Sequence, residues 1–313
     1  MVHGQAVHVP VLYDEVLEVL SPRPGGRYID CTLGGGGHAL GIVERSSQDG
    51  RLLGIDADIR AVEAARDRLK DYASRVVLVN DNFVHLARIV RDNAFPPADG
   101  ILFDLGLSTL QLESMERGFS FRIDAPLDMR FGVDQEETAY DLVNGLPERE
   151  LADLLYRYGE ESRSRAIARA ILRARQPEPI RTTLQLARII EQALPARGRI
   201  HPATRSFQAL RIAVNRELDN LEAALAQAVE LLGLEGVVAA ISYHSLEDRL
   251  VKQFFAAEAK GCVCPPRALS CVCGRKPRLQ VLTKKPITPS RQEVVRNPRS
   301  RSAKLRAARR IGP

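Results

Sequence analysis

The chain has 313 residues, 45% of them hydrophobic and 27% charged, so it can form one large domain or a domain with a sizeable insertion around a real core. No apolar run approaches the roughly 20 residues that cross a bilayer, and the first eleven residues lack the pattern of a signal peptide, so we expect a cytoplasmic protein. Aromatic residues make up only 5% and Trp is absent, which argues against a surface built to stack single-stranded bases.

The first hundred residues alternate between short aliphatic runs and helical patterns. Strands are predicted at Arg27–Cys31, Arg51–Ile55, Val76–Asn80 and Gly100–Phe103, and helices at Ala39–Ser46, Ile59–Tyr72 and Val84–Asn93. Short loops between strands and helices imply right-handed crossovers, which produce a parallel sheet with helices on both faces. The predicted fold class is therefore α/β, a Rossmann-like doubly wound sheet.

A different pattern occupies the middle of the chain. Between Ser108 and about Leu146 there is a loop-rich stretch, Ser108–Phe131, with no clear period, and from Pro147 to Leu232 the sequence is almost wholly helical. Helices are predicted there at Glu148–Tyr158, Ser162–Arg175, Leu184–Ala193 and Pro202–Leu232. Strand character returns at Gly236–Tyr243, before a predicted helix at Leu246–Ala259 and a strand at Leu279–Leu282. The simplest organisation is a sheet domain, residues 1–107 and 216–313, interrupted by a mostly helical insertion, residues 108–215.

The strongest local motif runs from Asp30 to His38 and contains Gly34, Gly35, Gly36 and Gly37 between the first strand and the first helix. Glycines allow sharp turns and a close approach of a ligand, and a helix N-terminus binds anionic groups. The loop fits a dinucleotide or S-adenosylmethionine. Asp56, at the end of the second strand, is placed to hold ribose hydroxyls in either case.

Two features favour the methyl donor over the dinucleotide. The third strand ends in Asn80-Asp81-Asn82-Phe83, where a polar side chain can meet an adenine amine and Phe83 can pack on the ring. Asp81 and Asn82 are equally able to cap a turn. The fourth strand ends at Asp104, followed by a tight turn at the carboxyl edge of the sheet, where ligands bind in such folds.

The C-terminal segment is strongly basic. Between Arg275 and Arg310 there are thirteen Lys or Arg residues and one acid, Glu293, a net charge of +12 that leaves −6 for the first 274 residues. A basic segment on an acidic body is typical of a phosphate-binding arm, and a solubilising tail is the alternative.

Five cysteines include a cluster of four, Cys262, Cys264, Cys271 and Cys273. Four thiolates can bind zinc tetrahedrally, whereas thiols without metal are the alternative. Cys31 stands alone at the end of the first strand and is expected to be a small core residue.

Several longer motifs resemble the RsmH (MraW) family of ribosomal RNA small-subunit methyltransferases, from His8 almost to the C-terminus. They are residues 104–112, 116–121, 124–130, 158–161, 201–211 with 215–218, 242–249 and 297–306. The resemblance implies an S-adenosylmethionine-dependent methyltransferase that modifies N4 of a cytidine in the 16S rRNA of the small ribosomal subunit. A homodimer is one option for its assembly.

The resemblance also implies roles for residues and domains. Residues 1–107 and 216–313 would form the catalytic domain, with 275–313 as its basic tail, and residues 108–215 would recognise the substrate. The donor-binding positions carried over are Gly36, Gly37, His38, Asp56, Phe83, Asp104 and Gln111.

Amine methylation benefits from a hydrogen-bond acceptor at the attacking nitrogen, and Asp104 is the candidate catalytic residue. Its carboxylate could contact the donor, the base or both. Substrate contacts are predicted for Arg130, in the loop Arg117–Arg130, and for His244, Ser245 and Arg249 after the strand Gly236–Tyr243. Ser245 is also a candidate helix N-cap, with Asp248 as its capping-box partner.

Three rival functions are open at this stage. An NAD-dependent dehydrogenase lacks support because the strict G-x-G-x-x-G motif is missing. A DNA amino-methyltransferase would show an acid–Pro–Pro motif, which is absent after the fourth strand. A non-catalytic RNA-binding protein would be favoured by loss of Asp56 or Asp104, and both are present.

Overall fold

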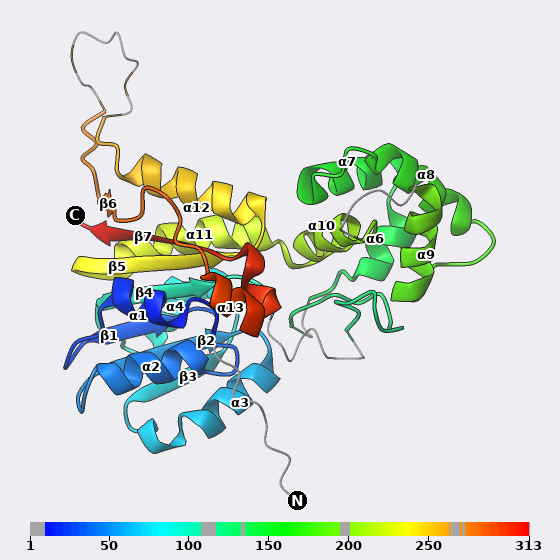
Figure 1. Cartoon of the computed structure of the whole chain (residues 1–313). Coiled ribbons are helices and arrows are strands. Elements are labelled where there is room, and N and C mark those ends of the chain that lie inside the picture. Colours follow the sequence, from blue (N-terminus) through cyan, green and yellow to red (C-terminus); the bar gives the residue numbers. More distant parts are fainter. Residues whose placement is uncertain are drawn as a thin grey trace, which may run out of the picture. The chain divides into compact units, whose positions relative to one another are not determined.

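The computed structural model describes residues 10–107, 117–132, 135–194, 201–262, 264, 270 and 273–312. The chain divides into two compact units (Figure 1). We call Met1–Gly106 with Leu218–Pro313 the sheet unit, and Leu107–Glu217 the helical unit. Among the described residues, no helix has the length and apolar character needed to cross a membrane.

The described part of the sheet unit contains one seven-stranded sheet. Its strands are β1 Arg27–Asp30, β2 Arg51–Asp56, β3 Val76–Asn80, β4 Ala98–Asp104, β5 Leu232–Ser242, β6 Leu279–Val281 and β7 Lys304–Arg310. Their spatial order is β3-β2-β1-β4-β5-β7-β6 (Figure 1). β1 to β5 run parallel, and β7 is antiparallel to β5 and β6. The predicted α/β fold, with strands after the insertion completing the sheet, is confirmed.

Two hydrophobic cores cover the two faces of the sheet, because side chains alternate along each strand. Tyr28 and Leu102 face one core, whereas Ile29 and Phe103 face the other. The first core is covered by α1 Tyr13–Leu20, α2 Gly37–Arg45 and α3 Ile59–Arg68, and the second by α4 Leu86–Asp92, α11 Glu217–Leu231 and α12 Ser245–Glu258. The 3-10 turns are η1 Lys70–Tyr72 and η2 Phe83–His85. Burial on both faces explains the nearly uninterrupted aliphatic runs of the strands.

The helical unit packs around a core of its own. Its described helices are α6 Ala139–Gly145, α7 Glu148–Gly159, α8 Ser164–Ala174, α9 Thr183–Ala193 and α10 Thr204–Asn215. Capping boxes begin two of them, with Thr138 and Asp141 at α6 and Thr182 and Gln185 at α9. In each box a side chain binds a backbone N–H that has no partner within the helix, which defines where the helix begins.

One predicted helix of this region is wrong, and one short helix was not predicted. The single helix Pro202–Leu232 is two helices, α10 and α11, separated at Arg216, whose φ of +49° lies in the left-handed region. Neither Gly nor Pro marks the break, and good helix formers continue on both sides, so the pattern missed it. The sequence pattern also did not predict the short helix α6, because seven residues are too few to show a helical period.

The described residues of the basic segment 275–313 are folded into the sheet unit and do not form a free arm or tail. This segment contains β6, α13 Arg291–Arg296, η3 Pro298–Ser302 and β7. Arg306 of β7 is 6% exposed, and it binds Asp248 at 2.6 Å while Lys304 binds the same carboxylate at 3.0 Å. Burial acts to raise the pKa of Asp248, but the hydrogen bonds from Arg306 and Lys304 lower it below its usual value. The segment is part of the sheet, and acids of the same unit neutralise part of its charge.

Candidate active site

The carboxyl ends of the five parallel strands meet at one edge of the sheet. The last residues of β1 to β5 are Asp30, Asp56, Asn80, Asp104 and Ser242. The strand order reverses between β1 and β4, and ligands of open α/β sheets bind at such a switch point. Thr32, just after β1, accepts a hydrogen bond at Oγ1 from the backbone N–H of Asp104 at 2.6 Å. Three carboxylates are therefore concentrated at the edge where a ligand is expected.

The glycine loop leads from β1 into α2. Gly34 and Gly36 have φ values of +50° and +74°, which favour glycine. A Cβ on Gly35 would meet nothing within 4 Å, so the backbone there is open to a ligand. Gly36 is the N-cap of α2 and has no side chain to bind the first turn. The first N–H groups of a helix lack intrahelical partners, so this turn can bind an anionic group.

Asp56 is held by two backbone groups. Oδ2 accepts a hydrogen bond from Gly34 at 2.8 Å, and Oδ1 accepts one from Asp58 at 2.9 Å. Burial raises the pKa of the Asp56 carboxyl to about 6, while these two hydrogen bonds oppose the rise. Each carboxylate oxygen has a further lone pair, so Asp56 is able to accept ribose hydroxyls as well.

Asp30 is a second carboxyl with an unusual pKa at this edge. It is 1% exposed, and its Oδ1 accepts a hydrogen bond from the Thr32 N–H at 3.1 Å. Burial raises its pKa to about 7, and attraction to His38 opposes that rise. Carboxyl groups with strongly raised pKa values cluster at functional sites, although structural networks also produce them.

His38 lies in the first turn of α2 and is 5% exposed. Within the described part of the chain, neither of its ring nitrogens has a hydrogen-bond partner. Nε2 lies 3.5 Å from Oδ2 of Asp104, and the ring stacks on Tyr13 with 6.1 Å between centroids. Because buried polar atoms are rarely left unpaired, His38 fits a site that a ligand completes.

Asp104 is oriented by its neighbour at the end of β5. The Tyr243 hydroxyl donates a hydrogen bond to Asp104 Oδ1 at 2.9 Å. Burial and the Asp104 charge raise the pKa of Tyr243 well above its usual value, so the phenol remains a donor. The Tyr243 ring occupies the space beside Gly106, where a Cβ would lie 2.8 Å from it. The carboxylate is thus held at Oδ1, while Oδ2 faces His38.

The end of β3 supplies one aromatic side chain and a capped turn. Phe83 begins η2, and its ring packs edge-on against Phe103 with 5.8 Å between centroids. Asn82 caps η2, while Asp81 binds His85 Nδ1 at 2.8 Å. Asp81 and Asn82 therefore have the local turn-capping role that was one of the two options for them.

The start of α12 is shifted by one residue from the predicted cap. His244, not Ser245, is the N-cap, and its Nδ1 accepts a hydrogen bond from the Glu247 N–H at 3.4 Å. Glu247 Oε2 in turn accepts the His244 N–H at 3.3 Å, so Glu247 and not Asp248 is the box partner. Ser245 and Arg249 are exposed on α12. A histidine cap is an uncommon choice, which is why the residue types pointed to the serine.

In the helical unit, Arg130 is engaged by its own loop. Its Nε and Nη2 bind the two carboxylate oxygens of Asp128 at 2.9 and 2.7 Å, and Nη1 binds the Gln135 carbonyl at 2.7 Å. Any contact with a substrate, as predicted for Arg130, would come in addition to this structural role.

Asn215, at the end of α10, fastens the same loop. It is 2% exposed, donates from Nδ2 to the Met129 carbonyl at 2.7 Å and accepts the Phe131 N–H at 2.8 Å. Met129 has a φ of +62°, a conformation that the asparagine contacts help to maintain. The sequence motif contained Asn215, but its spacing does not reveal a bond to a loop 84 residues away.

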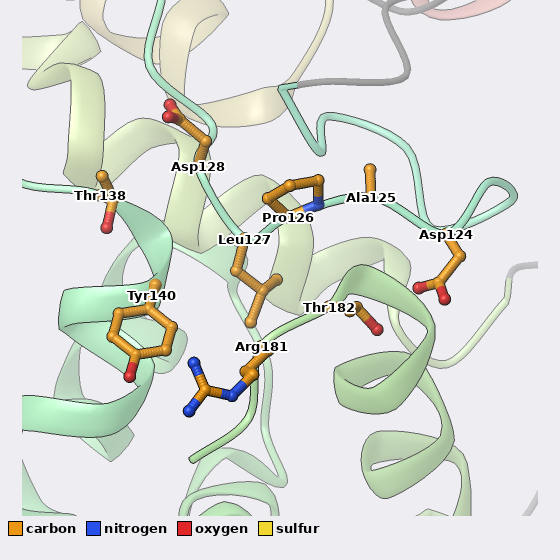
Figure 2. Close-up of a pocket in the computed structure, with 9 residues that line it drawn as sticks. All are labelled: Asp124, Ala125, Pro126, Leu127, Asp128, Thr138, Tyr140, Arg181 and Thr182. Atoms are coloured by element: carbon orange, nitrogen blue, oxygen red, sulfur yellow. The ribbon is translucent and has the colours of Figure 1, made fainter.

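The helical unit also has an open pocket of about 500 Å³, shown in Figure 2. It is lined by residues 124–128, by Thr138 and Tyr140 at the start of α6, and by Arg181 and Thr182 before α9. An isolated bridge between Pro126 and Thr182 joins two of these segments. The sequence did not single out Arg181, which lies outside every recognised motif.

Three cysteines of the cluster are described. The sulfur atoms of Cys262, Cys264 and Cys273 lie within 4.8 Å of one another. Cys271 and the predicted donor ligand Gln111 lie outside the described residues. Cys31 is 1% exposed in the sheet core, as expected.

A family model described as the MraW methylase family matches residues 5–311. The chain is 56% identical over 305 residues to ribosomal RNA small subunit methyltransferase H of Dehalococcoides mccartyi, covering 97% of this chain and 86% of that one. It is 54% identical over 305 residues to the protein of the same name from Thermomicrobium roseum, with 97% and 94% covered. A solved rRNA methylase from Streptococcus thermophilus is similar at a TM-score of 0.42 and 11% identity, over 96% of this chain and 94% of that one.

Proposed function

Since the chain belongs to the MraW methylase family, we propose that it transfers a methyl group from S-adenosylmethionine to N4 of a cytidine in the 16S rRNA of the small ribosomal subunit. The observation that carries the proposal is the convergence of the glycine loop, Asp56 and the Tyr243-bound Asp104 at the switch point of the sheet. The names of the relatives support the RNA substrate.

The residues at this edge fit the methyl donor. The ring nitrogens of His38, which have no hydrogen-bond partner among the described residues, and the open backbone at Gly35 leave polar groups and space for a ligand. We assign the donor contacts to Gly36, Gly37, His38, Asp56, Phe83 and Asp104, and by family resemblance to Gln111. In this assignment Asp56 accepts the ribose hydroxyls, the first turn of α2 binds the carboxylate, and Phe83 packs on the adenine.

When bound, S-adenosylmethionine supplies a sulfonium methyl group that is already activated for transfer. The remaining task for the protein is to orient the N4 amine, whose lone pair is delocalised into the cytosine ring. Asp104 Oδ2 is the acceptor that would bind an N4 hydrogen and take up its developing positive charge. Tyr243 and Thr32 hold Asp104 in place, at its side chain and at its backbone, so it needs little reorganisation.

Substrate contacts are proposed for four residues outside the glycine loop, namely Arg130, His244, Ser245 and Arg249. Ser245 and Arg249 are exposed on α12, next to the His244 cap. Arg130 lies in the loop that Asn215 fastens within the helical unit. Arginine can bind phosphates, and base-edge methylation requires an unstacked base, which loops of RNA provide at low cost.

The test is methyl transfer from labelled S-adenosylmethionine to isolated small ribosomal subunits and to naked rRNA, with the nucleoside identified by mass spectrometry. We expect N4-methylcytidine with the wild-type chain and none with Asp104→Ala. Another methylated nucleoside would replace the N4 assignment but keep the enzyme class. Donor binding without transfer to any RNA would favour another acceptor or a binding role.

A further inference from the structure

The cysteine cluster belongs to the long connection between α12 and β6, residues 259–278, which we call the excursion. Both ends of this excursion are held by Glu258, the last residue of α12, which is 7% exposed. Its carboxylate binds Arg275 at 2.6 Å and Arg278 at 2.7 Å, and its carbonyl accepts the Arg278 N–H at 2.9 Å. The first and last residues of the excursion are therefore held next to each other by the contacts of Glu258.

The sulfur positions within the excursion match a metal centre. The Sγ atoms of Cys262 and Cys273 lie 3.8 Å apart, and the Sγ of Cys264 lies within 4.8 Å of both. A disulfide would bring two sulfurs to about 2.05 Å, so the 3.8 Å pair is not one. Four thiolates around zinc at about 2.3 Å lie roughly 3.8 Å from each other, by tetrahedral geometry.

We propose that Cys262, Cys264 and Cys273 bind a zinc ion that fastens the excursion. Thiolate sulfur is the soft donor that zinc favours in structural sites. A metal that joins the two ends of a long connection limits the conformational freedom of the chain between them. The remaining cysteine, Cys271, lies outside the described residues, and the proposal does not depend on it.

The proposed zinc site lies far from the proposed active site, which indicates a structural and not a catalytic role for the metal. α12 begins at Ser245, just after the carboxyl end of β5, and runs back along the sheet to Glu258. β6 lies antiparallel to β7, as β5 does, so β6 and β5 run in the same direction and Leu279 begins β6 at the amino edge. The cluster is therefore at the edge opposite Asp56 and Asp104, as the end of α12 and the start of β6 in Figure 1 show.

The test uses the full chain, purified under reducing conditions, loaded with zinc and dialysed against metal-free buffer. We expect mass spectrometry of the metal to find one zinc per chain, and Cys273→Ser and Cys262→Ser to lose it. The matched control is Cys31→Ala, which removes a thiol from the sheet core and should retain the zinc. Circular dichroism shows that each variant is folded.

Three further measurements characterise this site and separate it from the proposed active site. Cobalt in place of zinc should give the visible absorption of a tetrahedral thiolate centre in the wild type and not in Cys273→Ser. Donor binding by Cys273→Ser should equal that of the wild type, while proteolysis between residues 259 and 278 becomes faster. Folded wild-type chain that retains no zinc would overturn the proposal, as would zinc retained by the double variant Cys262→Ser/Cys273→Ser.

Discussion

The Tyr243 hydroxyl donates a hydrogen bond to Asp104 across 139 residues of sequence, at 2.9 Å. The two residues end up together because β4 and β5 are adjacent parallel strands, with Asp104 in register with Ile241. The residue that follows β5 therefore orients the carboxylate that ends β4. This relationship makes Tyr243 a positioning residue for Asp104 in the proposed reaction.

Replacing Tyr243 by Phe should slow methyl transfer and leave donor binding largely intact, because the ring still fills the space beside Gly106. A hydrogen bond to a charged group contributes about 1.5–3 kcal/mol, so the single-turnover rate should fall roughly tenfold to a hundredfold. Tyr28→Phe is the control, since its hydroxyl binds the Arg23 N–H away from the proposed site. An unchanged rate in Tyr243→Phe would mean that the Asp104 orientation does not limit the reaction.

Asp56→Asn should weaken binding of the methyl donor. The amide has one acceptor oxygen where the carboxylate has two, so its NH₂ group would face the N–H of either Gly34 or Asp58. We expect the dissociation constant, measured by calorimetry, to rise by roughly tenfold or more. Asp99→Asn is the matched control, because Asp99 binds Arg23 and the Arg27 N–H instead. Equal affinity of Asp56→Asn and wild type would remove Asp56 from the donor site.

Asp30 should make stability depend on pH. Its folded-state pKa of about 7 lies above the ordinary value of 3.8. Below pH 3.8 the Asp30 carboxyl is protonated in both the folded and the unfolded state. As the pH rises towards 7, this carboxyl ionises first in the unfolded state, so the free energy of unfolding falls. Asp30→Asn should therefore gain stability over the wild type with rising pH, by on the order of 4 kcal/mol at most above about pH 7.

Urea unfolding of both Asp30 proteins at about pH 4.5 and about pH 8 measures this difference. The neighbouring charges that act on Asp30, those of His38, Asp56 and Asp104, are present in both proteins and cancel to first order. A stability difference that does not change between the two pH values would contradict the raised pKa.

His244→Ala should destabilise the fold through the loss of the α12 cap, by about 1 kcal/mol. His244→Asn should recover most of that loss, because asparagine is among the preferred N-cap residues. Ser245→Ala, one residue further, should cost less than about 0.5 kcal/mol. Thermal and urea unfolding distinguish the three variants, and a larger loss from Ser245→Ala than from His244→Ala would reinstate the serine as the cap.

Asn215→Ala should loosen the loop of residues 117–132. It removes the Asn215 bond to the Met129 carbonyl and leaves the Phe131 N–H with its weaker bond to Gln135 Oε1 at 3.1 Å, at a cost of about 1–3 kcal/mol. Trypsin cleavage at Arg117, Arg122 or Arg130 should become faster. Asn144→Ala is the control, because Asn144 holds both backbone groups of Ile180 and not this loop. Equal cleavage of the 117–132 loop in both variants would refute a specific role of Asn215.

The sequence could predict the parallel strands of the sheet and the position of the glycine loop, because both depend on local patterns. Aliphatic runs, a glycine cluster and acids just after strands are all readable within about ten residues. Strand β7 was missed, since its sequence KLRAARR reads as a basic segment. Its arginines are compatible with a strand only because Asp248 and other acids lie opposite them in the folded unit.

By itself the sequence determined the fold class, the family and the acids placed at the ends of β2 and β4. Those properties follow from residue type and spacing along the chain. Only the tertiary structure decided that Tyr243 holds Asp104, that His38 is buried beside it, that Asn215 fastens a distant loop and that three cysteine sulfurs converge. Each of these is a contact between segments far apart in sequence, and the pKa values of Asp30 and Asp56 depend on burial by such segments. Desolvation and long-range hydrogen bonds exist only once the chain has packed.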